Sequence, residues 1–312
     1  MEIFLDSNFT NSKILFVGEG NFSFSRYLIE NVKNDFSNII ATCYESESSL
    51  SESTKENVTA LIDHGVEVNF GVDATKLEEK FREIKWDKII FMFPHIGGKM
   101  KIQKNRELLK NFAQSVQKVL TKNGSVIVTL CDGQGGTPYD KCQRLEADSW
   151  QILKMMAFGS FGLTKVSKFN LEQYPGYRAY GYRSMDKGFH VDQGTIHVFQ
   201  SFPSIDHFDL EENKLEMICA PEYRHDLSFW LPKGQIELPE EHFQDIIKKS
   251  GKESVIAIDL IDKYFSDDKE LQSFTYRLTY CNTRFVIDPV KVMGLHYAIG
   301  SELENIFKVK IR

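Results

Sequence analysis

The sequence lacks a cysteine framework. Five of its 312 residues are cysteine; they form no CxxC pair, and no histidines accompany them at the spacing of a zinc site. This pattern favours free thiols in a reducing compartment over disulfides. We also expect no bound metal.

Long apolar runs are absent too. No run is long enough to span a bilayer, and the N-terminal stretch MEIFLDSNFTNS has the features of neither a signal peptide nor a transit peptide. We therefore expect a cytoplasmic protein, with the nucleolus as the alternative, and no membrane partner.

Positive charge is not in excess. Residues 1–200 carry 24 Lys and Arg against 24 Asp and Glu, and residues 201–312 carry 14 against 20, for a net charge of −6. An acidic chain is a poor non-specific binder of nucleic acid, so any contact with RNA must come from a local patch.

The length of 312 residues suits two domains.

The stretch ILFVGEGNFSFS, residues 14–25, predicts a buried strand, a glycine turn and the start of a helix. Gly18 and Gly20 would let the backbone approach a nucleotide-type cofactor closely, and an ordinary tight turn is the alternative. The third glycine of the dinucleotide fingerprint is missing, which disfavours a nicotinamide-dependent oxidoreductase.

Carboxylates follow the next two predicted strands. Glu45 ends the strand predicted over 39–44, where an acidic residue can accept hydrogen bonds from ribose hydroxyls; it could equally be a solvated residue of the segment ESESSLSES. Asp73 follows the strand predicted over 66–72. It could accept a hydrogen bond from the amine of adenine or cap the next helix.

Further strands predict one open sheet. A strand over 88–93 runs into PHIGG. A helix is expected over 105–120, with Asn123-Gly124 as the signal that ends it, and a strand over 125–131 runs into DGQGGTPYDK. Five such strands with right-handed crossovers predict a parallel, helix-flanked sheet. Two late strands, at 163–169 and 195–199, favour the sheet of class I S-adenosylmethionine-dependent methyltransferases over that of a dehydrogenase.

Tyrosines alternate with basic residues between these late strands. The basic residues Arg178, Arg183 and Lys187 are interleaved with four tyrosines in QYPGYRAYGYRSMDKGFH. Aromatic rings beside guanidinium groups suit unpaired bases and phosphates. The alternative is a packed surface hairpin.

Residues 14–200 resemble the rRNA uridine-N3 methyltransferase-like family. The resemblance rests on VGEGNFSFS, ATCYES, GVDATKL, FMFPHIGGK, NRELLKNF, GQGGTPYDK and the segment GYRS to GFHV. It implies that S-adenosylmethionine is the cofactor, that Glu45 holds its ribose and that Asp73 reads its adenine. The residues expected to wall the site are Gly18, Gly20, Asn21, Phe22, Phe93 and Pro94, and core packing is the alternative for Phe22.

The last third of the chain carries a second resemblance. The order strand, helix, strand, strand, helix, strand predicts a ferredoxin-like fold. The segments PEYRHDLSFWL, SVIAIDLIDKYF and FTYRLTY resemble the anticodon-binding domain of phenylalanyl-tRNA synthetase β chains. Together the halves resemble the animal family of ferredoxin-fold anticodon-binding domain-containing proteins. We expect a Rossmann-like α/β methyltransferase domain at 1–202, a linker at 203–214 and a smaller α+β ferredoxin-like domain at 215–312.

Uridine-N3 methylation needs an acceptor for the N3 proton. His95 and Asp140 lie on loops at the predicted carboxyl edge of the sheet, and histidine is the side chain that titrates near neutrality. The alternatives are a loop-shaping histidine and a helix-capping aspartate. In the last domain, Arg224 and Arg277 would contact RNA or pair with Asp226 and Asp259.

The sequence thus predicts an S-adenosylmethionine-dependent RNA methyltransferase that forms N3-methyluridine in rRNA. Two alternatives remain: a methyltransferase acting on tRNA, and a non-catalytic tRNA- or rRNA-binding protein that retains the cofactor pocket. The oligomeric state stays open.

Overall fold

The computed structural model describes residues 4, 11–31, 36–98, 101–179, 191–203, 215–266 and 271–312. The chain divides into two compact units, residues 1–202 and residues 203–312. Each unit buries its own apolar core. The predicted linker at 203–214 lies, except for Pro203, outside the described residues.

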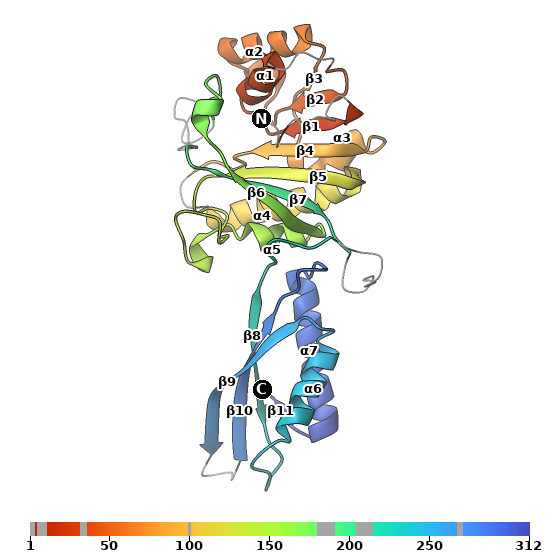
Figure 1. Ribbon diagram of the computed structural model, residues 1–312, viewed down its shortest axis with the longest axis vertical. Helices are drawn as coiled ribbons and strands as arrows, with labels where there is room; N and C mark the ends of the chain where they lie inside the picture. The colour runs from red at the N-terminus through yellow and green to blue at the C-terminus, as the bar shows by residue number, and fades with distance from the viewer. Residues whose placement is uncertain are drawn as a thin grey trace. The chain divides into compact units, whose positions relative to one another are not determined.

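The first unit is built on a seven-stranded sheet (Figure 1). Its strands are β1 Ile14–Val17, β2 Ile39–Thr42, β3 Glu67–Asn69, β4 Trp86–Met92, β5 Leu120–Leu130, β6 Phe161–Lys168 and β7 Thr195–Ser201. Its α-helices are α1 Ser23–Glu30, α2 Glu52–Asp63, α3 Leu77–Phe81, α4 Ile102–Val119 and α5 Ile152–Ala157.

The strand order is β3-β2-β1-β4-β5-β7-β6, and β7 runs antiparallel to both its neighbours. The order reverses between β1 and β4, so the carboxyl ends of these strands border the crevice where open α/β sheets bind ligands. The predicted Rossmann-like methyltransferase fold is confirmed. The helix predicted over 105–120 ends within one residue of α4, at Val119, but Asn123-Gly124, expected to end the helix, lies inside β5.

Helices cover both faces of this sheet. On one face, Phe24 and Leu28 of α1 and Leu61 of α2 pack with Phe16 of β1 in a single apolar core. On the other face, the ring of Phe91 in β4 lies 5.0 Å from that of Phe112 in α4. The strands β1 and β4 are almost wholly buried, which explains their continuous apolar sequence.

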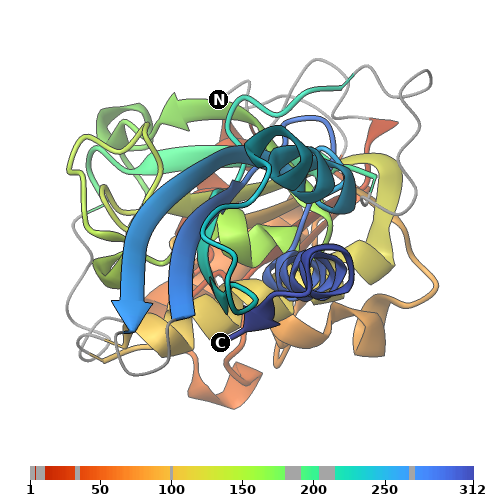
Figure 2. The same cartoon turned by 90° about the horizontal axis from the view of Figure 1, so that it is seen from below.

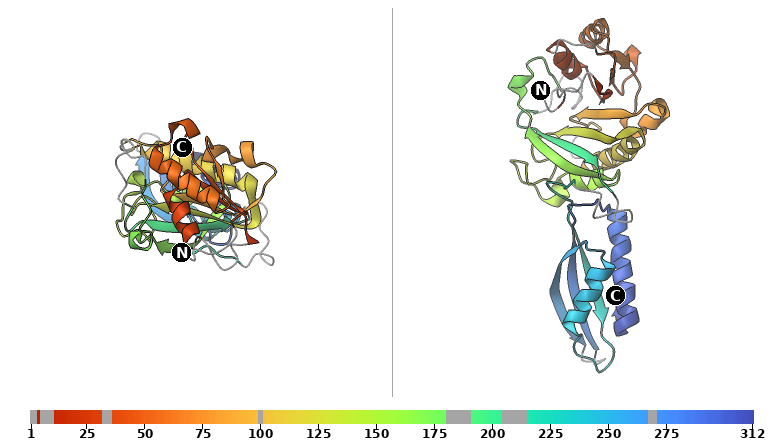
Figure 3. Two further views of the ribbon diagram at one scale, coloured as in Figure 1. Left: turned by 90° about the horizontal axis from the view of Figure 1, so that it is seen from above. Right: turned by 45° about the vertical axis from the view of Figure 1, so that its right-hand side comes forward.

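The second unit has the predicted βαββαβ order, and its fold class is confirmed. Its elements are β8 Tyr223–Trp230, α6 Glu240–Ser250, β9 Val255–Ser266, β10 Leu271–Tyr280, α7 Pro289–Phe307 and β11 Lys310–Ile311. The four strands form an antiparallel sheet in the order β11-β8-β10-β9. Figure 2 shows α6 and α7 on one side of the curved strands β9 and β10, and Figure 3 shows the two helices side by side.

Within the described ranges, no helix combines the length and the apolar composition required to cross a membrane. In the same ranges, no group of three or more His, Cys, Asp or Glu side chains is placed to hold a metal ion.

Candidate active site

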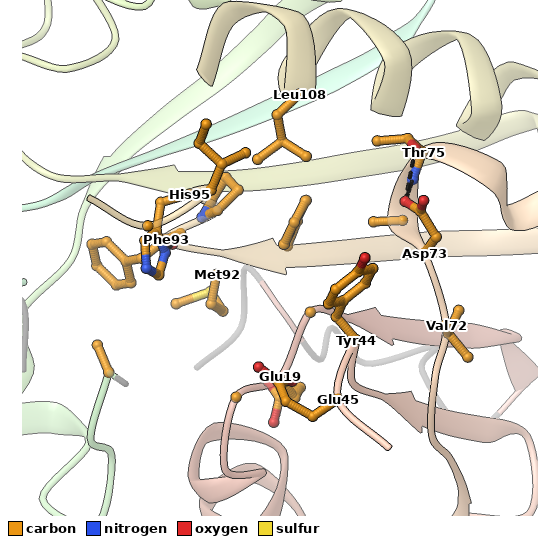
Figure 4. A pocket seen from close by; sticks show the side chains of 18 of the residues that line it. Glu19, Tyr44, Glu45, Val72, Asp73, Thr75, Met92, Phe93, His95 and Leu108 are labelled. Atoms are coloured by element: carbon orange, nitrogen blue, oxygen red, sulfur yellow. Dashed lines mark hydrogen bonds between the residues drawn. The ribbon is translucent and has the colours of Figure 1, made fainter. Parts of the chain in front are cut away.

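A cavity of about 690 Å³ opens at the carboxyl ends of the strands around the order reversal. Its walls come from the loops after β1, β2, β3 and β4, from α4, and from the connection between β6 and β7. Figure 4 shows several of the side chains that line it. Its volume falls in the range of pockets that hold a nucleotide-sized ligand.

The glycine turn forms one wall of this cavity. Gly18 has φ of +65°, and a β-carbon built on it would lie 2.3 Å from Cε2 of Phe91, so only glycine fits. Gly20 and Asn21 line the cavity as expected. Phe22 does not line it: its ring is fully buried and packs edge-on against Phe70, so the core-packing alternative is the one observed.

The two predicted carboxylates both reach the cavity. Glu45 is exposed on its lining, just beyond β2. Asp73 also lines it, and its Oδ1 accepts hydrogen bonds from the backbone N and the Oγ1 of Thr75, at 2.8 and 2.7 Å (Figure 4). Asp73 therefore caps a short turn, Ala74–Lys76, while facing the cavity. Both capping bonds use Oδ1, so the cap does not use Oδ2.

The loop after β4 supplies three predicted site residues, Phe93, Pro94 and His95, and all three line the cavity. Phe93 has φ of +47°, which is strained for a bulky side chain. Its backbone N donates to the carbonyl of Thr129 at 2.8 Å, which holds the turn. The Nδ1 atom of His95 lies 3.3 Å from the carbonyl O of Phe93.

Glu19 is a site residue that the sequence analysis missed. It lies between the two glycines, lines the cavity and is only 7% exposed. Its Oε2 accepts hydrogen bonds from the Oγ of Ser25 at 2.7 Å and from the backbone N of Ser25 at 3.2 Å. Burial raises the pKa of Glu19 to about 7. The signal in the sequence that could have identified Glu19 is its charge, because the turn around it otherwise consists of apolar and small residues.

A second missed wall is residues 171–179, which we term the strap. It is the part of the β6–β7 connection that follows β6, and it brings Tyr177, Arg178 and Ala179 to the cavity. Ser23 holds it in place, because its Oγ accepts a hydrogen bond from the backbone N of Arg178 at 3.0 Å. The single hydroxyl proton of Ser23 is shared between Oδ1 of Asn21, at 2.8 Å, and the carbonyl of Arg178, at 3.3 Å. Tyr177 stacks on Phe93 with ring centroids 6.1 Å apart.

The strap changes the interpretation of the tyrosine-rich segment. Tyr174 is 2% exposed and stacks on Phe169 at 5.0 Å, so it packs in the core and does not present its ring to RNA. Arg178 is exposed at the edge of the cavity. The predicted RNA contacts Arg183 and Lys187 lie outside the described residues.

Asp140 is not among the residues that line the cavity, and it is 4% exposed. Its Oδ2 accepts a hydrogen bond from the backbone N of Thr137 at 2.9 Å, and its Oδ1 accepts one from the Oγ1 of Thr195 at 3.2 Å. The carboxylate therefore braces the glycine-rich loop against β7. This position gives no support to the predicted catalytic role of Asp140, because one carboxylate oxygen is bonded to the loop and the other to Thr195 of β7.

The two arginines proposed for RNA contact in the second unit are paired. Arg277 makes a bidentate bond to Asp226 at 2.8 and 2.9 Å, as the alternative interpretation expected. Arg224 pairs with Glu222 at 2.5 Å, a partner that the sequence analysis did not name. Both pairs are exposed, so they contribute little to stability.

These features agree with the family comparison. A family model described as "rRNA (uridine-N3-)-methyltransferase BTM5-like" matches residues 15–181. The chain belongs to this family. The match covers the glycine turn, both carboxylates, the loop after β4 and the strap, and it confirms the resemblance seen in the sequence of the first unit.

Individual members and relatives cover different parts of the chain. Mouse ferredoxin-fold anticodon-binding domain-containing protein 1 homolog is 45% identical over 196 residues, which are 61% of this chain and 31% of the mouse protein. Yeast 25S rRNA (uridine(2634)-N(3))-methyltransferase is 28% identical, covering 53% of this chain and 64% of the yeast protein. Rat mitochondrial phenylalanine–tRNA ligase is 33% identical over 92 residues, 30% of this chain and 19% of the ligase. The chain thus matches about a third of the mouse relative's length.

Proposed function

We propose that this protein is an S-adenosylmethionine-dependent methyltransferase that forms N3-methyluridine in rRNA. The observation that carries the proposal is the convergence of four strand ends on one cavity in a chain of this family. The activity for which the yeast relative is named supports the choice of uridine N3 and of rRNA.

The cavity fits this cofactor by its chemistry. Acceptors for an adenine amine and for ribose hydroxyls are available on Asp73 and Glu45, and the glycine turn leaves room for the amino-acid end. The side chains of Met92 and Phe93 give apolar surface between these polar ends. When bound, S-adenosylmethionine would supply a methyl group on a sulfonium, which is transferred by in-line displacement.

The acceptor side of the cavity is the loop after β4. His95 is half-buried there and is our proposed acceptor for the uracil N3 proton. Tyr177 and Phe93 offer aromatic faces for a base that has left its stack. Arg178, exposed at the cavity edge, would contact the phosphate of the same nucleotide.

The second unit is our proposed additional RNA contact. Its sheet face opposite α6 and α7 carries Trp230, covered by the guanidinium of Arg312 at 5.1 Å and flanked by the ring of Tyr264 at 5.9 Å. Aromatic rings beside a guanidinium suit stacking of unpaired bases. The similarity of this region to a tRNA ligase makes tRNA the competing substrate.

Two measurements test the proposal. Calorimetric titration with S-adenosylmethionine should show binding, and heat with a dinucleotide instead would overturn the assignment. Mass spectrometry of nucleosides from rRNA and tRNA fractions, incubated with enzyme and labelled cofactor, should show labelled N3-methyluridine in rRNA.

His95→Gln should reduce labelling about 100-fold or more while cofactor binding is kept. Binding without labelling of either RNA would support the non-catalytic alternative.

A further inference from the structure

Glu19 differs from the other acidic side chains of the cavity in its burial. Glu45 is exposed, whereas Glu19 is 7% exposed and lies on the turn between Gly18 and Gly20. Both hydrogen bonds from Ser25 fall on Oε2. The hydrogen bonds that join Glu19 to Ser25 of α1 therefore do not use its second carboxylate oxygen, Oε1.

This buried carboxylate lacks a positive partner within the described part of the chain. The pKa of Glu19 is set by its burial and by the two hydrogen bonds from Ser25. No lysine, arginine or histidine contributes to this pKa. Burying a carboxylate without a counter-charge is costly, so the group favours either a proton or a cationic ligand.

We propose that Glu19 is the counter-charge for the ammonium group of the cofactor's amino-acid end, and that binding of this ammonium displaces a proton from the Glu19 carboxyl group into solvent. The proposal rests on the proposed function, because it requires a ligand of the S-adenosylmethionine type in this cavity.

The titration of Glu19 supports the proposal. Its pKa of about 7 in the ligand-free protein means that about half of the molecules carry the proton at neutral pH. Neighbouring groups do not compete for this role. Burial, with a smaller contribution from the Glu19 charge, raises the pKa of the Cys43 thiol to about 12 and that of Tyr177 well above its usual range, so both stay neutral near pH 7.

Other charged groups on the cavity lining are Glu45 beyond β2, Asp73 beyond β3, His95 beyond β4, Arg178 on the strap, and Lys104 and Glu107 on α4. Of these, His95 is also our proposed proton acceptor. A variant of His95 must therefore accompany the test.

Proton linkage predicts how affinity changes with pH. A ligand that binds only the ionised carboxylate should bind about tenfold more weakly at about pH 6 than at about pH 8. At about pH 7, binding should release about half a proton, and at about pH 6 almost a full proton.

The test is calorimetric titration of the full chain with S-adenosylhomocysteine in buffers of different ionisation enthalpy. This ligand carries the ammonium but no sulfonium and cannot be turned over. Methylthioadenosine, which lacks the amino-acid end, is the matched control ligand and should bind without proton release. Glu19→Gln should abolish the release and flatten the pH dependence, while His95→Gln should keep both.

The outcomes separate this inference from the proposed function. Binding of S-adenosylhomocysteine without proton release, or release that persists in Glu19→Gln, overturns the role of Glu19 but leaves the methyltransferase proposal standing. Release with S-adenosylmethionine alone would assign the counter-charge to the sulfonium and also overturn the inference. Absence of binding by both adenosyl ligands would overturn the proposed function itself.

Discussion

Burial of Glu19 links the stability of the ligand-free protein to pH. The folded protein keeps the Glu19 proton up to about pH 7, whereas the unfolded chain loses it near the ordinary glutamate pKa of 4.5. Between these values Glu19 holds more of its proton in the folded state, so the contribution of Glu19 to the free energy of unfolding should fall as pH rises and level off above about pH 7.

Glu19→Gln should remove this loss. Glutamine can keep the acceptor for Ser25 without the charge, so the variant should be more stable than the parent at about pH 8, by about 2 to 3 kcal/mol, and equal to it at about pH 4. Urea unfolding at both pH values measures this. A variant that is less stable at the higher pH would contradict it.

Asp73 combines a structural and a binding role that two substitutions can separate. Asp73→Asn keeps an oxygen to accept from Thr75, so it should preserve stability and still weaken cofactor binding by about 1 to 3 kcal/mol through the lost Oδ2 acceptor. Asp73→Ala should lose the cap as well, about 1 kcal/mol of stability. Calorimetry and thermal unfolding measure the two effects. Unchanged affinity in both variants would remove Asp73 from the site.

Residues at strand ends were predictable because their position follows from the topology. Glu45 and Asp73 stand directly after predicted strands and His95 stands two residues after one, and such residues meet at one edge of a parallel sheet. Phe22 and Glu19 were not, because a sequence does not reveal which side chain of a turn points into the core. Phe22 adopts φ of +58°, a conformation that sequence pattern does not signal for phenylalanine.

At the scale of elements, the strap illustrates the limit of pattern-based prediction. Alternating tyrosines and arginines suit both an RNA surface and a packed segment. The deciding factor is a contact remote in sequence: Tyr174 packs against Phe24 of α1 at 5.5 Å, about 150 residues away. The paired residues Arg277 and Asp226 show the same limit in the second unit, since cross-strand register sets them opposite each other.

Ser23→Ala should loosen the strap. It removes the hydrogen bond from the backbone N of Arg178, worth about 1 kcal/mol, and the weaker contact to the carbonyl of Arg178. Limited trypsin digestion followed by mass spectrometry should show faster cleavage after Arg178, by about fivefold or more. Ser48→Ala, at an exposed serine away from the cavity, is the matched control and should cleave at the parental rate. Equal rates in both variants would show that Ser23 does not hold the strap.

At the scale of the whole molecule, each of the two units packs apolar side chains of its own, as the described residues show. One packs β1 and β4 with α1 and α2, and the other packs β8 and β10 with α6 and α7. The order of predicted strands and helices sufficed to predict both folds, because each unit repeats a regular alternation. The antiparallel placement of β7 between β5 and β6 is a long-range pairing that periodicity alone does not specify.

Because the cavity is lined by residues within 18–179, a fragment of residues 1–202 should bind the cofactor without the second unit. We expect its dissociation constant to lie within about twofold of the full chain's, and its affinity for RNA to fall about tenfold or more. Calorimetry and filter binding measure these. A fragment with native circular dichroism but no cofactor binding would contradict the independence of the first unit.

The position of the strap also sets the order in which the cavity is assembled during synthesis. The glycine turn and the loops after β2, β3 and β4 leave the ribosome early, whereas Tyr177 and Arg178 follow about 80 residues after the last of these loops. A nascent chain that ends before residue 171 therefore lacks one wall of the cavity, the one that Tyr177, Arg178 and Ala179 supply.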